Sequence, residues 1–354
     1  MNLFPEHIIL NGEKTSVAEF LKTSPKSDLK NFLSEWYSKK KFIEVTTSGS
    51  TGKPKTIRLA KDFVAASAQR TIQFFQLKKG DRVLHCLPER YVAGKLMIIR
   101  ALLGNLDLFA AEPATNFSFL QTEKFRFAAM VPAQVNKILH SEPHPGSWFQ
   151  NLEQLLIGGS AVPFSVEKKL QSIPTSCYSS YAMTETATHI ALRRLNENGA
   201  DEYYHCMDDI TVQLSKENCL QIFMPGLAEQ PLQTTDLAKL IDEKTFRILG
   251  RSDNVIISGG IKYSPEQIEK KLEPFIKIPF LISSLPHESL GEQLAMVIKG
   301  NENDELLQNV KTICEMRLTK YEQPRQIIFV QQLPKVENSK PDRKKLRLEM
   351  KNIF

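Results

Sequence analysis

Short apolar runs typical of β-strands alternate with segments of helical spacing through the first half of the chain. The run over residues 41–46 is strand-like, and after a loop rich in glycine and threonine, apolar side chains recur at helical spacing from Val64 to Phe75. Further strands are expected at residues 82–87, 106–111, 125–131 and 152–157, and further helices at 94–103, at 134–140 and from Pro163 onward. Such repeated units predict an α/β domain with a largely parallel sheet and helices on its faces.

The pattern changes near Asp209, where closely spaced apolar runs predict an antiparallel β subdomain. A polar break at residues 250–253 separates this region from a third one. There Ser264 begins an S-x-x-Q capping box with proline at the first helical position, which predicts a helix start. We therefore expect a large α/β domain over residues 1–252, including the antiparallel subdomain, and a small α+β domain over residues 253–354.

The composition excludes several classes of protein. A chain of 354 residues is long enough for about two domains, and 42% hydrophobic with 24% charged residues is ordinary for a globular protein. The longest apolar stretch, residues 96–111, is interrupted by Arg100, Asn105 and Asp107, so we expect no membrane-spanning helix, and residues 1–10 do not resemble a secretory signal. Five cysteines without a C-x-x-C pair favour the reducing cytoplasm. A net charge of +6 is too small to indicate nucleic-acid binding.

One loop has a distinctive chemistry. The segment Thr46 to Lys55, TTSGSTGKPK, directly follows the first predicted strand. Its hydroxyl groups, glycines and lysines offer the O–H donors, backbone N–H groups and positive charge that bind phosphate. It is not a Walker A sequence, because only two residues separate its glycines and Pro54 follows the first lysine. A solvated turn is the alternative interpretation.

This loop and several later motifs, in the same order, resemble the adenylate-forming superfamily of acyl-CoA synthetases, nonribosomal-peptide adenylation domains and luciferases. The later motifs are GGSAVP at 158–163, YAMTET at 181–186, TTD at 234–236, GRSD at 250–253, SGG at 258–260, PEQIE at 265–269, and LPK at 333–335 with Lys340 and Arg343. The resemblance runs from about residue 46 to 346. It implies the fold of that superfamily and an enzyme that activates a carboxylic acid with ATP and Mg²⁺.

The resemblance also implies a role for each matching residue. Lys340, Thr184 and Glu185 are the expected catalytic residues, and Glu185 is the expected Mg²⁺ ligand. Gly259 and Gly260 are expected in the loop that meets CoA. The residues expected to bind ATP or AMP are Thr47, Ser48, Gly49, Ser50, Thr51, Gly52, Lys55, Gly159, Ser160, Tyr181, Asp236 and Arg251.

Five positions depart from the family pattern. Ala182 and Thr235 stand where glycine is usual beside the nucleotide, and Tyr91 stands where many relatives have histidine. Ser339 and Pro341 flank the tail lysine, and a proline restricts the backbone of the residue before it. These departures leave open a function of another class, a catalytically silent nucleotide-binding regulator.

The phosphate loop arrives near residue 46, earlier than in full-length relatives, which predicts a reduced first subdomain. This feature and the stretches at 94–100 and 186–192 resemble the o-succinylbenzoate:CoA ligases of menaquinone biosynthesis. That acid has two carboxylates of which one reacts, so the other needs a cation. An Arg100 that snorkels from an amphipathic helix is the alternative to a ligand role. The residues expected to contact the acyl substrate are Tyr91, Lys95, Arg100, Gly158, His189 and Arg193.

The implied reaction is the ligation of a carboxylic acid to CoA through an acyl-adenylate, catalysed by an AMP-forming acid–thiol ligase. ATP and CoA are the expected co-substrates, and the C-terminal domain is expected to be a mobile lid hinged at Asp253. The alternatives within the superfamily are another acyl- or aryl-CoA ligase and an enzyme that loads a carrier protein. We expect no nucleic-acid partner and no membrane insertion, and the sequence leaves a homodimer open.

Overall fold

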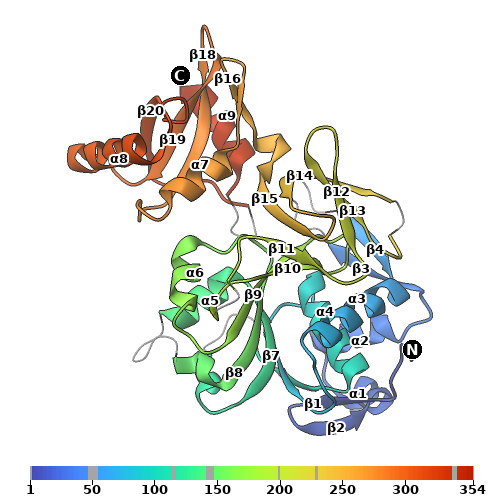
Figure 1. Ribbon diagram of the computed structural model, residues 1–354. Helices are drawn as coiled ribbons and strands as arrows, with labels where there is room; N and C mark the ends of the chain where they lie inside the picture. Colours follow the sequence, from blue (N-terminus) through green and yellow to red (C-terminus); the bar gives the residue numbers. More distant parts are fainter. Residues whose placement is uncertain are drawn as a thin grey trace. The chain divides into compact units, whose positions relative to one another are not determined.

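The computed structural model describes residues 2–46, 55–112, 117–140, 147–197, 200–227, 230–336 and 341–353. The chain forms two compact units (Figure 1): unit 1 is Met1–Thr211 with Phe223–Gln230, and unit 2 is Val212–Ile222 with Pro231–Phe354. The expected division at residue 252 lies inside unit 2. That division, and a hinge at Asp253, therefore remain predictions.

Unit 1 is built on a mixed sheet that is mostly parallel. Its strands lie in the order β2-β1-β6-β5-β7-β8-β9-β10-β11, and every pair from β1–β6 to β8–β9 is parallel. The outer pairs β1–β2, β9–β10 and β10–β11 are antiparallel. The strands are β1 His7–Leu10, β2 Glu13–Ser16, β5 Arg82–His85, β6 Asp107–Ala110, β7 Phe125–Met130, β8 Leu152–Ile157, β9 Ser176–Ala182, β10 His189–Arg194 and β11 Tyr204–Cys206.

Helices cover both faces of this sheet, as the alternating pattern predicts. Figure 1 shows α5 and α6 on one side of β7–β9, and α3 and α4 on the other. Met130 of β7 belongs to a core cluster with Val135 of α5 and Val166 of α6, whereas Phe127 contacts the Phe75 ring that follows α3, at 4.7 Å between centroids. The helices are α1 Val17–Thr23, α2 Asp28–Trp36, α3 Lys61–Phe74, α4 Val92–Gly104, α5 Pro132–Leu139 and α6 Phe164–Leu170.

The first predicted strand is not part of this sheet. Strand β3, Phe42–Thr46, forms a two-stranded antiparallel ribbon with β4, Thr56–Ala60, which the sequence analysis did not anticipate. The chain folds back on itself after the phosphate loop, and β4 leads directly into α3. Such a hairpin depends on hydrogen bonding between β3 and β4, which the alternation of strands and helices in the sequence does not reveal.

Unit 2 begins with antiparallel strands, as expected from residue 209 onward. They lie in the order β12-β13-β14-β15, followed by a five-stranded sheet in the order β17-β16-β19-β18, with β20 parallel to β19. The strands are β12 Thr211–Leu214, β13 Cys219–Phe223, β14 Leu232–Leu240, β15 Thr245–Arg251, β16 Ile256–Ser258, β17 Ile261–Tyr263, β18 Phe280–His287, β19 Gly291–Lys299 and β20 Gln326–Val330. The helices are α7 Pro265–Leu272, α8 Asp304–Arg317 and α9 Arg343–Ile353.

Strand β19 is covered on both faces, because its side chains alternate between two cores. Met296 belongs to a cluster with Ile268 of α7 and Val310 of α8, while Val297 belongs to a second cluster with Leu346 of α9. Two-sided burial explains why this strand is continuously apolar rather than alternating. Across the described ranges, no helix is long and apolar enough to cross a membrane.

Candidate active site

The phosphate loop sits at the end of the β3–β4 ribbon. Thr46 pairs with Thr56 across the ribbon, and Lys55 is exposed just before β4. The intervening loop residues Thr47, Ser48, Gly49, Ser50, Thr51 and Gly52, and the expected catalytic Lys340, lie outside the described residues. Their nucleotide and catalytic roles therefore stay predictions.

Two of the other motifs share one edge of the unit 1 sheet. Strands β8 and β9 are parallel, with Ile157 opposite Ser179, so GGSAVP begins where β8 ends and YAMTET lies where β9 ends. In open α/β sheets, ligands bind beyond the carboxyl ends of the strands. The fold thus brings the segments 158–163 and 181–186 to the edge where such a site is expected.

The turn after β8 depends on two glycines. A Cβ atom on Gly158 would lie 2.4 Å from the Ser180 hydroxyl oxygen, so a larger residue would force the Ser180 side chain to move. Gly159 has φ of +85°, in the left-handed region that favours glycine. Ser160 follows with its side chain exposed. Because Gly158 and Gly159 carry no side chains, a flat ligand can approach their backbone closely.

The β9–β10 turn is fixed by a buried hydroxyl. The backbone N–H of Met183 donates to Thr186 Oγ1 at 3.1 Å, and the same hydroxyl lies 2.7 Å from the carbonyl oxygen of Thr188. These bonds hold a tight turn that includes Ala187 at φ +61°. Thr184 and Glu185 are presented half-buried in this turn.

Glu185 and Thr184 offer oxygen donors, which is the chemistry that Mg²⁺ prefers. Mg²⁺ in phosphate-transferring sites is held by one or two carboxylates together with the phosphates of the substrate. Among the described residues, no group of three or more acidic, histidine or cysteine side chains could hold a metal ion. Thr184 and Glu185 can thus offer oxygen ligands to an ion that arrives with ATP, and the role of Glu185 as a Mg²⁺ ligand remains a prediction.

A buried polar cluster lies beside this turn. Arg100 of α4 is 2% exposed, and its Nη2 donates to Thr188 Oγ1 at 3.0 Å, while its Nε is buried without a hydrogen-bond partner. His189 at the start of β10 lies with Nδ1 3.1 Å from Thr188 Oγ1 and Nε2 3.4 Å from Thr71 Oγ1. Arg100 forms no ion pair with a carboxylate of the described residues.

Burial controls the charges in this cluster. It lowers the pKa of Arg100 to about 9, so the guanidinium is still charged at neutral pH. Burial, and after it the charge of Arg100, lowers the pKa of His189 well below 6.5, so the imidazole is neutral. A buried cation among neutral polar groups is an environment that binds a carboxylate strongly.

The two other cations expected near the acid already have carboxylate partners. Lys95 Nζ lies 2.7 Å from Glu35 Oε2, and Arg193 donates to Glu167. A cation that neutralises a carboxylate of its own chain is poorly suited to bind another. Of the three candidates, the described residues thus leave Arg100 without a carboxylate partner.

Two aromatic residues of the expected site are partly exposed. Tyr91 precedes α4, and the Arg90 guanidinium lies 4.8 Å from the centroid of its ring. The Tyr181 ring lies 6.0 Å from that of Tyr204. Neither ring is buried in the core, so both can contact a ligand, and their expected roles remain predictions.

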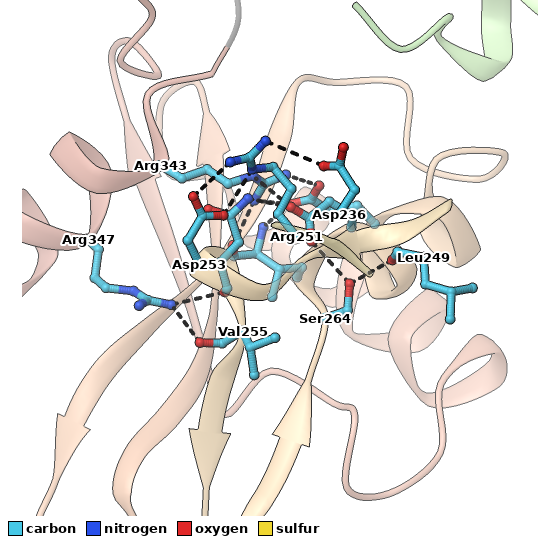
Figure 2. Close-up of polar contacts among 12 residues, drawn as sticks. Asp236, Leu249, Arg251, Asp253, Val255, Ser264, Arg343 and Arg347 are labelled. Carbon is cyan, nitrogen blue, oxygen red and sulfur yellow. Dashed lines mark hydrogen bonds and ion pairs between the residues drawn. The ribbon is translucent and has the colours of Figure 1, made fainter. Parts of the chain in front are cut away.

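In unit 2, one arginine links the expected ribose ligand to the expected hinge (Figure 2). Asp236 of β14 lies opposite Arg251 of β15, with 3.4 Å between Oδ1 and Nη1. The Nε and Nη2 atoms of Arg251 donate to the two Asp253 carboxylate oxygens, each at 2.9 Å. These bonds hold the pKa of Asp253 below its usual value.

Helix α7 begins differently from the predicted capping box. The Ser264 hydroxyl does not cap the helix; it donates to the Leu249 carbonyl oxygen at 2.8 Å. Glu266 accepts from Asn254 Nδ2 at 2.5 Å. A Cβ atom on Gly250 would lie 2.3 Å from Ser264 Oγ, which requires glycine there. Ser264, which precedes α7, thus contacts the backbone before the expected hinge, and Glu266 of α7 contacts the side chain of Asn254 just after it.

The composition of the basic tail suggests a solvated face. The structure shows instead that two of its arginines contact other parts of unit 2. Arg343 at the start of α9 makes a two-pronged contact with Glu269, at 2.9 and 2.5 Å. Arg347 one turn later donates to the carbonyl oxygens of Asn254 and Val255 at 3.1 and 3.4 Å. The spacing of two arginines at i and i+4 could have indicated this anchoring face.

The Gly259–Gly260 pair forms the two-residue turn of the β16–β17 hairpin. Both glycines have positive φ, +56° and +80°, which is typical of a type I′ hairpin turn. The flanking Ile257 and Ile261 are 50% and 47% exposed. The hairpin joins the sheet through β16, and the Gly259 N–H donates to the Leu290 carbonyl oxygen at 3.1 Å. Its contact with CoA remains a prediction.

The departures from the family pattern are accommodated without strain in the described residues. The Ala182 and Thr235 side chains are exposed, so neither displaces packed groups. Pro341 forms an isolated β-bridge with Lys335. Ser339 lies outside the described residues.

Comparison with known proteins confirms the resemblance to AMP-binding enzymes. Residues 41–209 match the family model for AMP-binding enzymes. The chain is 31% identical to an acyl-CoA synthetase (AMP-forming)/AMP-acid ligase II-like protein of Dyadobacter fermentans, with 94% of this chain and 97% of that one covered and a TM-score of 0.62.

More distant similarities agree. The chain is 23% identical to the 2-succinylbenzoate–CoA ligase of Listeria monocytogenes, over 95% of this chain and 75% of that protein, and 25% identical to that of Bacillus mycoides, over 95% and 76%. Its fold is similar to the o-succinylbenzoate CoA synthetase of Bacillus subtilis in complex with ATP and magnesium, with 19% identity, 86% and 69% coverage and a TM-score of 0.69.

Proposed function

The chain belongs to the family of AMP-binding enzymes, and from this premise we propose that it is an ATP-dependent acid:CoA ligase that works through an acyl-adenylate. The observation that carries the proposal is the common sheet edge at the ends of β8 and β9. There the glycine turn at 158–159 and the turn with Thr184 and Glu185 lie side by side on adjacent strands. The relatives named as acyl-CoA synthetase and as 2-succinylbenzoate–CoA ligase support it.

In the first half-reaction, an oxygen of the acid attacks the α-phosphorus of ATP. An O–P bond forms, the bond to the β-phosphate oxygen breaks, and pyrophosphate leaves. Both reactants are anions, so cationic groups must lie where negative charge accumulates. Lys340 and Lys55 would supply that charge, and Mg²⁺ held by Glu185 would neutralise the phosphates.

In the second half-reaction, the CoA thiolate attacks the acyl carbon and AMP leaves. The C–S bond of the thioester replaces the C–O bond of the adenylate. The C-terminal domain would turn about Asp253 between the two steps, so that the Gly259–Gly260 hairpin replaces Lys340 at the reacting carbon. The two-glycine turn and its exposed position support this part of the proposal.

The proposed acid is o-succinylbenzoate, which would place the enzyme in menaquinone biosynthesis. Arg100 supports an acid with a second carboxylate, because its buried guanidinium lacks a carboxylate partner among the described residues. The neutral His189 beside it can donate or accept a hydrogen bond without competing for the anion. A different acid, or a carrier protein in place of CoA, is the second candidate within the same chemistry. The cytoplasm as its location and a homodimer as its assembly remain predictions.

The test is pyrophosphate release with Mg·ATP and CoA across a panel of o-succinylbenzoate, benzoates, short and long fatty acids and amino acids. Selective turnover of o-succinylbenzoate with formation of its CoA thioester is the expected result. Turnover of a monocarboxylic acid alone would keep the mechanism and discard the proposed substrate. ATP binding without turnover of any acid would instead favour the silent regulator.

A further inference from the structure

A partly buried ion pair lies beside the ribbon that carries the phosphate loop. Lys95 of α4 and Glu35 of α2 are 2.7 Å apart between Nζ and Oε2, with side chains 10% and 24% exposed. The Lys95 ammonium also lies 5.0 Å from the centroid of the Phe32 ring. Removing one partner of such a pair leaves a buried, uncompensated charge, so the pair is strongly held in place.

Both members of the pair bind the backbone of one residue, Glu44 of β3. The Glu44 N–H donates to Glu35 Oε1 at 2.7 Å, and Lys95 Nζ donates to the Glu44 carbonyl oxygen at 2.7 Å. Strand β3 pairs with β4 on one edge. On its other edge the ion pair supplies the acceptor and the donor that a third strand would otherwise provide.

The pair connects the ribbon to two helices that are firmly packed. Lys95 lies in the buried stretch of α4, and Glu35 precedes the fully buried Trp36 of α2. The other end of the ribbon is held by Lys61, whose Nζ donates to the Ser38 carbonyl oxygen at 2.8 Å and whose N–H donates to the Lys41 carbonyl oxygen at 2.9 Å. The ribbon is therefore anchored to the same helical layer at two places.

We propose that Glu35 and Lys95 are positioning residues for ATP. By fixing the outer edge of β3 they fix Thr46 and Lys55, the described residues on either side of the phosphate loop. This inference rests on the proposed nucleotide role of that loop, and it replaces the expected role of Lys95 as an acid ligand. A shift of about 1 Å in a positioned group can lower a rate by about 100-fold, so loosening the ribbon has a measurable cost.

The experiment compares Lys95→Met and Glu35→Gln with Arg58→Met, a matched control that removes an exposed cation from the same ribbon. Arg58 pairs with the Glu44 side chain at 3.3 Å and does not touch the buried pair. In Lys95→Met we expect kcat/KM for ATP to fall by about 10- to 100-fold. The KM for the acid and the rate of thioester formation from supplied acyl-adenylate should stay unchanged. Amide exchange over residues 42–46 should accelerate, and Arg58→Met should behave as the parent protein.

Two results would overturn the inference. A rise in KM for the acid, with ATP kinetics unchanged, would restore Lys95 as an acid ligand. If Lys95→Met lowers the rates of adenylation and of thioester formation equally, or lowers neither, the ion pair has no particular role in ATP binding. Should Lys95→Met fail to fold, the charge-neutral double variant Glu35→Gln/Lys95→Met replaces it.

Direct titration with ATP separates this inference from the proposed reaction. If the parent protein turns over no acid yet binds ATP, weaker ATP binding by Lys95→Met still supports the positioning role. Equal ATP affinity of parent and variant would refute it. Absence of ATP binding by the parent protein would refute the proposed function and the inference together.

Discussion

Replacing Arg100 with methionine should make the protein more stable and less selective at the same time. The guanidinium is buried, and burial lowers its pKa to about 9. A lowering of several pKa units corresponds to a penalty of a few kcal/mol on the charged form in the folded state, at about 1.4 kcal/mol per unit. Met is similar in length and can fill most of the space, and a volume-conserving replacement costs less than about 1.5 kcal/mol.

We therefore expect the free energy of unfolding of Arg100→Met to rise at pH 7, by about 1–4 kcal/mol if the gain is like that found when buried ion pairs are replaced by apolar groups of similar volume. At about 2–4 °C per kcal/mol, the melting temperature should rise by several degrees. The pKa of Arg100 lies lower in the folded than in the unfolded state, so the unfolded state binds more protons above about pH 9. Stability of the parent should therefore increase as the pH rises from about 9, and that increase should be absent in the variant.

The assay is thermal unfolding with and without a dicarboxylic acid, together with kinetics on that acid and a monocarboxylic analogue. The dicarboxylic acid should stabilise the parent protein, because its second carboxylate offsets the buried charge, and it should stabilise Arg100→Met much less. The variant should also show a larger rise in KM for the dicarboxylic acid than for the analogue. A lower melting temperature combined with unchanged selectivity would refute this reasoning, because Arg100 would then be a structural residue.

Two further predictions concern other parts of the chain. Lys340→Ala should abolish adenylation but largely retain thioester formation from supplied acyl-adenylate; equal loss of both would contradict its assigned role. Gly94→Ala should destabilise unit 1 by about 1–3 kcal/mol in denaturant unfolding, because the new Cβ would lie 2.3 Å from the Pro88 carbonyl oxygen. Gly104→Ala in the same helix meets only Leu106 side-chain atoms, the nearest at 2.9 Å, and should cost less. Equal losses for the two glycine variants would show that the close backbone contact is not the cause.

The sequence predicts features that depend on neighbouring residues, and it misses those that depend on distant ones. The strand–helix alternation correctly indicates the mostly parallel sheet, and the glycine turn at 158–159 follows from its motif. The partner of Lys95 was not predictable, because Glu35 is sixty residues away and belongs to a helix that no motif marks. The partner of Arg343 was not predictable for the same reason, because a basic stretch has the same composition whether its arginines face solvent or a half-buried Glu269.

Because α9 is anchored by contacts to distant positions, substitutions at those positions should have non-additive effects. Arg343 and Arg347 hold Glu269 and the backbone at 254–255 in one piece, so a change at either end alters the same set of contacts. Substitutions that contact one another combine non-additively, whereas distant ones add. Removing Arg343 should thus destabilise a variant with a neutral residue at 269 less than it destabilises the parent protein. The two positions are therefore constrained to change together during evolution. Random mutagenesis aimed at the expected hinge would therefore need to include the final helix to find its compensating changes.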